Sequence, residues 1–322
     1  MIEREAKEEL EKEGYRIIGK HSAVKICRWT KKSLIDEGVC YKQKFYGIDS
    51  HRCCQMSCTL FHCENKCIHC WRNLKYTKLG KVKNPDDPKK IIDACISKQK
   101  KLLMGFKGND NVNMKKFEEA QEPMQFAISL IGEALNYPKI GEFIYELTKR
   151  GKTSFLVSNG LNASVLQELG EKDCLPTQLY ISMNVPDKEL FDRWHNSSVD
   201  SAWDKFNESL DVLKSLKNKT RTVLRMTLVK DKNMLHEHVK GYVDLISKAR
   251  PDFVEVKGFV SVGFSRQRLG YDMMPTHEEI KEFGERLVDE LRARGLKDYK
   301  VLDEHEVSKI VLIGDGEKER KI

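Results

Sequence analysis

The segment CENKCIHC, residues 63–70, indicates the class of fold more strongly than any other part of this 322-residue chain. It places Cys63, Cys67 and Cys70 on one short loop, and no fourth cysteine follows at a similar spacing. Three thiolates leave one iron of a [4Fe–4S] cluster open for a cofactor to chelate, whereas four would close the cluster. A zinc site completed by His62 or His69 is the alternative.

Around this loop, short apolar runs alternate with amphipathic segments. The runs predict strands over residues 52–60, 125–131, 154–157, 178–183, 222–229 and 253–259. Apolar residues at helical spacing predict helices over residues 2–13, 86–103, 139–150, 162–169, 200–216, 235–250 and 277–294. This alternation predicts an α/β fold with a parallel sheet curled into a partial (β/α)6 barrel. A doubly wound open sheet is the alternative, and periodicity alone does not separate the two.

No internal repeat or obvious linker divides the chain. We therefore expect an N-terminal extension over residues 1–51, a barrel over residues 52–300 and a C-terminal extension over residues 301–322. In either sheet architecture, ligands bind at the carboxyl ends of the strands.

Composition limits the class of protein. No run approaches the ~20 apolar residues of a membrane span, and ten cysteines in a chain of this length favour metal or cluster ligation over a disulfide framework. We expect a cytoplasmic protein with no membrane partner. The formal net charge of +8 favours a polyanionic partner such as nucleic acid.

The cysteine loop is similar to that of the radical S-adenosylmethionine (SAM) superfamily. In that superfamily, an aromatic residue beside the last cysteine lies near adenine, and a Gly-Gly-Glu motif after the second strand holds the methionyl ammonium group. Here residues 129–133 read SLIGE, so only one of the two glycines is present. The resemblance implies SAM contacts by His69, Gly132, Glu133, Ser158, Asn159, Ser182 and Asn184, with Arg225 as a further candidate.

Local alternatives exist for two of these motifs. Glu133 also fits an acid at the start of a helix, where it would interact with the helix dipole. The Ser158-Asn159-Gly160 segment also fits a plain turn.

A second cysteine triplet lies upstream. Cys27, Cys40 and Cys53 follow one another at intervals of thirteen residues, and loops of that length can bring three thiolates around a second cluster with an open iron. Three unrelated thiols are the alternative.

The two triplets together resemble the tRNA 4-demethylwyosine synthases, in their archaeal single-domain form. Further likeness lies in Glu122-Pro123, Tyr137-Pro138, Arg268-Leu-Gly and Met274-Pro275-Thr276-His277, and it extends from about Cys27 to the last helix. Ala134 is a departure, because the family favours proline there.

The resemblance implies two [4Fe–4S] clusters, SAM and a reaction at the 1-methylguanosine that follows the anticodon of tRNA-Phe. The cluster at Cys63, Cys67 and Cys70 would cleave SAM, and the resulting radical would take hydrogen from the methyl group. Pyruvate would supply two carbons to the new ring, anchored by the second cluster. A lysine of the family is proposed to form a Schiff base with pyruvate; Lys42 fits this role, with Lys44 as its competitor.

Since no flavin-binding segment precedes Cys27, we expect an external flavodoxin- or ferredoxin-like electron donor, and we expect a monomer.

Basic residues follow the cluster loop without any acid among them. Trp71 and Tyr76 are interleaved with them, and phosphate contacts combined with base stacking are how single-stranded RNA loops are held. A solvated basic surface is the alternative. The candidate RNA contacts are Arg72, Lys75, Lys78, Lys81 and Lys83.

Two other functions compete with this one. A radical SAM tRNA methylthiotransferase also combines an N-terminal cysteine triplet with CxxxCxxC, but it would add a separate α/β domain and a β-barrel tail. A non-catalytic, zinc-stabilised RNA-binding protein would need no SAM loop after the second strand.

Overall fold

The computed structural model describes residues 2–322, which form one ten-stranded sheet in the order β1-β2-β3-β4-β5-β6-β7-β8-β10-β9. The strands are β1 (Arg16–Ile18), β2 (Ser22–Lys25), β3 (Cys53–Ser57), β4 (Gln125–Ile128), β5 (Thr153–Ser158), β6 (Gln178–Ser182), β7 (Arg221–Arg225), β8 (Phe253–Lys257), β9 (Lys300–His305) and β10 (Ile310–Gly314). The helices are α1 (Arg4–Lys12), α2 (Arg28–Leu34), α3 (Tyr41–Tyr46), α4 (Pro88–Leu103), α5 (Met114–Ala120), α6 (Ile140–Lys149), α7 (Ala163–Glu171), α8 (Lys188–His195), α9 (Ala202–Ser215), α10 (Val239–Ala249) and α11 (His277–Ala293).

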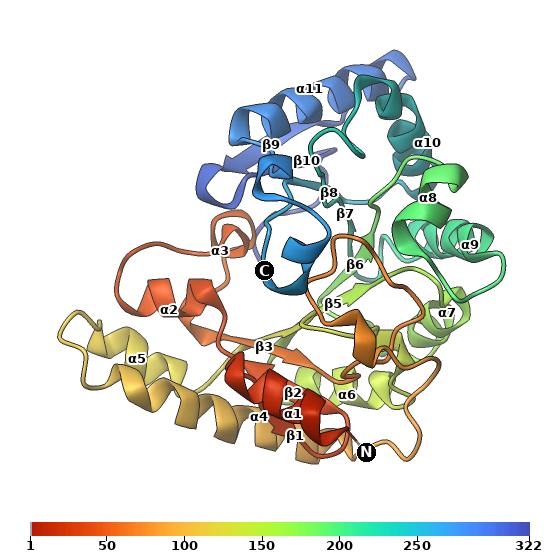
Figure 1. Ribbon diagram of the computed structural model, residues 1–322. Coiled ribbons are helices and arrows are strands. Elements are labelled where there is room, and N and C mark those ends of the chain that lie inside the picture. Colours follow the sequence, from red (N-terminus) through yellow and green to blue (C-terminus); the bar gives the residue numbers. More distant parts are fainter. Residues whose placement is uncertain (1) are drawn as a thin grey trace.

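The six central strands, β3 to β8, are parallel and lie in chain order. A doubly wound sheet reverses its strand order at a switch point, so this alternative is wrong and the predicted partial barrel is confirmed. Helices α4, α6, α7, α9, α10 and α11 follow the outside of the curved sheet from one edge to the other (Figure 1). All six predicted strands are present, each within a few residues of its expected bounds.

Both terminal segments add strands to the edges of this sheet. Strand β2 pairs antiparallel with β1 and β3, and β10 pairs antiparallel with β8 and β9. Residues 16–25 and 300–314 therefore extend the sheet of the barrel. No helix among residues 2–322 is long and apolar enough to cross a membrane.

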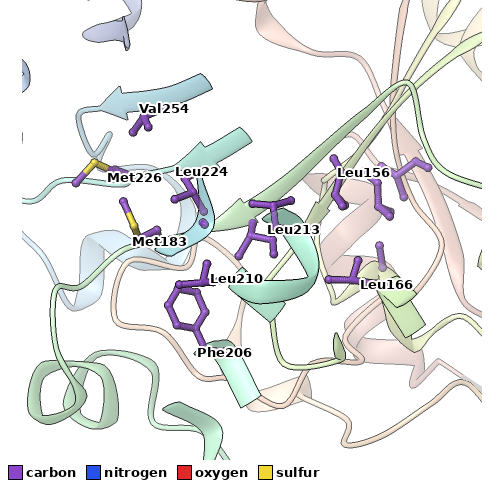
Figure 2. Close-up of a cluster of buried hydrophobic side chains, with 14 of the residues drawn as sticks. Leu156, Leu166, Met183, Phe206, Leu210, Leu213, Leu224, Met226 and Val254 are labelled. Atoms are coloured by element: carbon purple, nitrogen blue, oxygen red, sulfur yellow. The ribbon is translucent and has the colours of Figure 1, made fainter. Parts of the chain in front are cut away.

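The main core lies between the outer face of the sheet and the helices. Figure 2 shows Leu156 of β5 on the side of α7 and Leu224 of β7 on the side of α9, with Val254 of β8 beside Met226. Successive side chains of a strand point to opposite faces, so these residues face the helices and their neighbours face the barrel interior.

A second core fills the interior of the barrel. Helix α3 lies between the two edges of the curved sheet (Figure 1), and Tyr41, Phe45 and Tyr46 pack against inward-facing side chains such as Tyr180 and Phe253. The helix ends where Gly47 adopts a left-handed conformation with φ of 75°, which glycine adopts without a steric penalty. The N-terminal extension thus contributes directly to the barrel interior.

Helix α6 offers a matched test of the packing. Phe143 is fully buried and contacts Tyr137 edge to face, with ring centroids 6.3 Å apart; Tyr145, two residues on, is 59% exposed. We expect Phe143→Ala to lower the free energy of unfolding by about 3–5 kcal/mol, since it leaves a cavity, and Tyr145→Ala to change it by less than about 0.5 kcal/mol. Urea denaturation monitored by circular dichroism would measure both. Equal effects would contradict this assignment of the buried face.

Candidate active site

A cavity of about 390 Å³ lies at the carboxyl ends of the parallel strands. It brings together most of the residues predicted to hold a cluster and SAM: Cys63, Cys67, His69, Cys70, Gly132, Glu133, Ser158, Asn159, Ser182 and Arg225. A groove of about 520 Å³ between α4, α6 and α7 is larger, but none of these residues lines it. We place the candidate site in the smaller cavity because the chemistry-bearing side chains meet there.

The cysteine loop is held by hydrogen bonds from both sides. The backbone N–H of Ile68 donates to Trp194 O at 3.1 Å, and Arg268 Nε donates to Ile68 O at 3.0 Å. Arg72 lies beneath the loop, where its guanidinium donates to Asn65 O and to Thr77 Oγ1. These contacts fix the loop backbone independently of any bound group.

Arg72 also tunes the thiols above it. Burial raises the pKa of Cys63, while the Arg72 guanidinium acts in the opposite direction. A buried cation beside three cysteines stabilises their thiolate forms, which are the forms that ligate iron. The donor set and its charge environment therefore fit a cluster with three protein ligands.

The zinc alternative gains no support from the described residues. Within residues 2–322, no three His, Cys, Asp or Glu side chains gather as the ligands of one metal ion would. A zinc site needs its ligands about 2.0–2.3 Å from a single ion. A cluster instead holds its thiolates on separate irons.

The SAM-loop residues meet at the end of β4. Gly132 has φ of 84°, and a Cβ atom there would lie 2.0 Å from Thr59 O, so a side chain at this position would collide with the backbone. The carboxylate of Glu133 accepts hydrogen bonds from the backbone N–H of Asn159 at 2.7 Å and of Leu135 at 3.1 Å. Burial raises the pKa of Glu133 to about 7, so a cationic ammonium group at this carboxylate would offset an unfavourable burial.

Two of the other predicted SAM contacts, His69 and Asn159, lie beside the cluster cysteines and line the cavity. His69 accepts a hydrogen bond at Nδ1 from Trp194 Nε1 at 2.8 Å, and burial lowers its pKa to about 3. Its ring is therefore neutral and oriented. Asn159 Nδ2 lies 3.9 Å from Cys63 Sγ, which links the end of β5 to the cysteine loop.

Asn184 lies outside the cavity. Its Oδ1 accepts from Thr227 N at 3.1 Å, and its carbonyl accepts from Asn233 Nδ2 and from Tyr242 OH. Because these bonds join the loops after β6 and β7, its position favours a structural role over the predicted SAM contact.

The second cysteine triplet also converges. Cys27 precedes α2, Cys40 precedes α3 and Cys53 begins β3. Burial, followed by the effect of the neighbouring Cys27 thiol, raises the pKa of Cys40 to about 12. Cys53 responds to both other thiols in the same way. The three sulfur atoms are thus close enough to interact, although twelve residues lie between each cysteine and the next.

Lys42 points into the barrel interior, and Lys44 does not. The Lys42 Nζ lies 4.4 Å from the ring centroid of Phe155 and 4.7 Å from that of Tyr180. Burial lowers the pKa of Lys42, and Arg225 lowers it further. Lys44 is exposed and pairs with Asp303 at 3.1 Å. The geometry therefore favours Lys42 over its competitor as the reactive amine.

Some residues of the basic segment after the cysteine loop are buried or form ion pairs within the protein. Arg72 is buried beneath the loop, and Tyr76 is buried against Phe61. These two placements favour structural roles over the predicted RNA contacts. Lys75 pairs with Glu5 at 3.1 Å, and Lys78 is partly exposed. Lys81 and Lys83 are exposed, and Trp71, 38% exposed, lines the cavity.

Sequence reasoning missed two inward-facing residues of β8. Glu255 is fully buried, and Lys257 lines the same cavity as the cluster cysteines. Burial, assisted by Arg225, lowers the pKa of Lys257 to about 8. The signal was available in principle: alternation along Phe253–Lys257 puts residues 253, 255 and 257 on one face.

Comparisons with known proteins agree with this site. The family model for the radical SAM superfamily matches residues 59–246, and the model for wyosine base formation matches residues 248–315. The S-adenosyl-L-methionine-dependent tRNA 4-demethylwyosine synthase of Pyrococcus abyssi is 47% identical over 94% of this chain and 86% of its own length. The enzyme of the same name from Methanocaldococcus jannaschii is 35% identical over 97% of this chain and 96% of its own.

Two solved structures share the fold over the whole chain. A structure of TYW1 with a lysine-pyruvate adduct bound superposes with a TM-score of 0.85 at 34% identity, covering 100% of this chain and 98% of that one. A crystal structure of archaeal TYW1 gives a TM-score of 0.78 at 31% identity and covers 100% of both chains. The chain therefore belongs to the family of S-adenosyl-L-methionine-dependent tRNA 4-demethylwyosine synthases, within the radical SAM superfamily.

Proposed function

We propose that this enzyme converts the 1-methylguanosine that follows the anticodon of tRNA-Phe to 4-demethylwyosine, with pyruvate as the donor of two carbons. The observation that carries the proposal is the placement of Lys42, whose amine lies inside the barrel beneath the cavity lined by Cys63, Cys67 and Cys70. The related structure with a lysine-pyruvate adduct supports the same chemistry. Family membership excludes the methylthiotransferase alternative.

The radical SAM family uses SAM and a [4Fe–4S] cluster. When bound, these two groups supply the one-electron chemistry that removes a hydrogen atom from the substrate methyl group. The side chains of Cys63, Cys67 and Cys70 would hold the cluster, and Glu133 would bind the ammonium group of SAM. We assign a second cluster to Cys27, Cys40 and Cys53. We also propose that an external flavodoxin- or ferredoxin-like protein donates the electrons. We further propose that the enzyme acts as a monomer.

Lys42 would hold the two-carbon donor covalently. Its neutral amine attacks the keto carbon of pyruvate, an N–C bond forms, and the carbonyl oxygen leaves as water. The rings of Phe155 and Tyr180 form an apolar wall around this amine, which excludes bulk water from the linkage. Trp71, which lines the cavity and is partly exposed, would lie beside an extruded nucleobase that enters it.

The two cysteine triplets should separate by partial reaction. We expect Cys67→Ala to abolish reductive cleavage of SAM, because the cluster loses one of three ligands, and Cys40→Ala to spare SAM cleavage but stop nucleoside formation. Product analysis by mass spectrometry and iron analysis of anaerobically purified protein would measure this, with about eight irons per chain in the parent. Buried Cys95→Ala is the control. Equal loss of both activities in Cys40→Ala would make the second triplet structural.

Lys42 should carry the pyruvate adduct. Borohydride reduction in the presence of pyruvate should add mass to the peptide that contains Lys42, and Lys42→Arg should lose both adduct and product because a guanidinium is not nucleophilic at neutral pH. Lys44→Arg, two residues away and exposed, should retain both. An adduct mapped to Lys44, or an active Lys42→Arg enzyme, would remove Lys42 from the mechanism.

The exposed lysines that follow the cysteine loop in the chain should contribute to tRNA affinity. We expect Lys81→Gln combined with Lys83→Gln to weaken tRNA binding and to reduce the slope of log affinity against log salt by roughly 1.5, since two phosphate contacts are lost. Lys297→Gln with Lys300→Gln removes the same charge from two exposed positions, one after α11 and one at the start of β9, and serves as the control. Filter binding across salt concentrations measures the tRNA affinity and the salt slope of both double variants. If the Lys81/Lys83 variant has the same slope as the control variant, these two lysines belong to an ordinary solvated surface.

A further inference from the structure

Helix α3 carries Lys42, and its last carbonyl groups take their hydrogen bonds from a segment far along the chain. The last four carbonyls of an α-helix have no N–H partner within the helix. In α3, Lys44 O accepts from Lys321 Nζ, and Tyr46 O accepts from the backbone N–H of Ile322 at 2.9 Å. The chain end marked C lies beside α3 (Figure 1). Residues 321 and 322 therefore cap the helix that carries the reactive amine.

Arg221 holds this capping segment in place. It is the first residue of β7 and is buried. Its two terminal nitrogens donate to the backbone carbonyls of Glu319 and Arg320, and its Nε donates to Gln178 Oε1 at 3.0 Å. The guanidinium also lies 5.5 Å from the ring centroid of Tyr46. One side chain thus contacts both α3 and the segment that caps it.

This arrangement lies at the opposite end of the barrel from the cavity. Gln178 and Arg221 are the first residues of β6 and β7, whereas the cavity is at the carboxyl ends of the strands. The cysteine loop and the SAM-loop residues are therefore separated from Arg221 by the length of a strand. A change at Arg221 or in residues 319–322 reaches the Lys42 amine through α3.

We propose that Arg221 is a positioning residue, which holds residues 319–322 against the end of α3 and thereby fixes the Lys42 amine at the keto carbon of its substrate. The inference rests on the function proposed above and adds the contacts that keep the amine in place. Helix α3 has only six residues, and such a helix is not stable alone. Precise placement matters, because a displacement of about 1 Å can lower a reaction rate by roughly a hundredfold.

The first test is independent of pyruvate. Amide hydrogen exchange, followed by mass spectrometry of peptides, compares the parent with two variants, a deletion of residues 319–322 and Arg221→Lys. Lysine keeps the charge but lacks the planar fork that reaches three acceptors at once. We expect the α3 peptide to exchange about tenfold faster in both variants, since its local opening becomes easier, and the α10 peptide to exchange as in the parent.

The second test measures the chemistry at Lys42. Borohydride trapping at pH 7 gives the pyruvate concentration for half-maximal adduct, and SAM cleavage without tRNA is measured on the same preparations. We expect this concentration to rise about tenfold in both variants because the amine is misplaced, while SAM cleavage stays at the parental rate.

Arg150→Lys is the matched control. Arg150 also holds more than one partner, Asp93 at 2.5 Å and Glu146 at 2.8 Å, but it lies at the end of α6. It should leave both the exchange of α3 and the trapping on Lys42 unchanged, and an effect equal to that of Arg221→Lys would overturn the proposal.

Three other results would also overturn it: unchanged exchange of α3, equally faster exchange of α3 and α10, or faster exchange of α3 with parental trapping. A loss of SAM cleavage as large as the loss of adduct would assign Arg221 a general structural role instead. Absence of any pyruvate adduct on Lys42 in the parent would refute the proposed function itself, whereas the exchange of α3 reports on the Arg221 contacts alone.

Discussion

The buried carboxylate of Glu255 is the constraint on which the barrel interior depends. It comes from β8, is fully buried, and accepts hydrogen bonds from two tyrosines of α3 that lie more than two hundred residues earlier in the chain. Removing one partner of a buried charge typically costs about 3–5 kcal/mol. Helix α3 is only six residues long, and a helix of that length is not stable alone. Its place in the barrel therefore comes from this carboxylate and the aromatic packing around it.

The parallel strands and outer helices were predictable because their signals are local. Strands buried on both faces are continuous apolar runs, and each outer helix has one apolar face. The insertion of α3 into the barrel was not predictable, because it depends on hydrogen bonds to Glu255 of β8, a strand far along the chain. Ile310–Gly314 is a buried apolar strand, but its antiparallel pairing with β8 depends on how the sheet curves and leaves an edge open.

The residues of the candidate site also include some that the sequence predicts and some that it does not. Cys63, Cys67 and Cys70 could be found by spacing, and Gly132 and Glu133 by their place after a strand. Arg72 and Tyr76 were expected at an RNA surface because their types suit one, yet the chain turns beneath the cysteine loop and buries both. Lys42 and Lys44 are the same type of residue in the same short segment, but positions two apart on a helix point to different faces. Only the placement of α3 shows which amine enters the barrel.

Strand β3 sets the spacing between the two cysteine triplets. Cys53 begins it, and the loop with Cys63 follows its carboxyl end; five residues in a strand span about 13 Å from first to last. Between these ends, Gln55 shares the inward face with Cys53 and lines the cavity. A three-carbon acid is much shorter than this span, so it cannot contact both triplets at once. In the proposed function Lys42 holds the acid near the second triplet, which leaves the cavity at the cluster cysteines for SAM and the nucleobase.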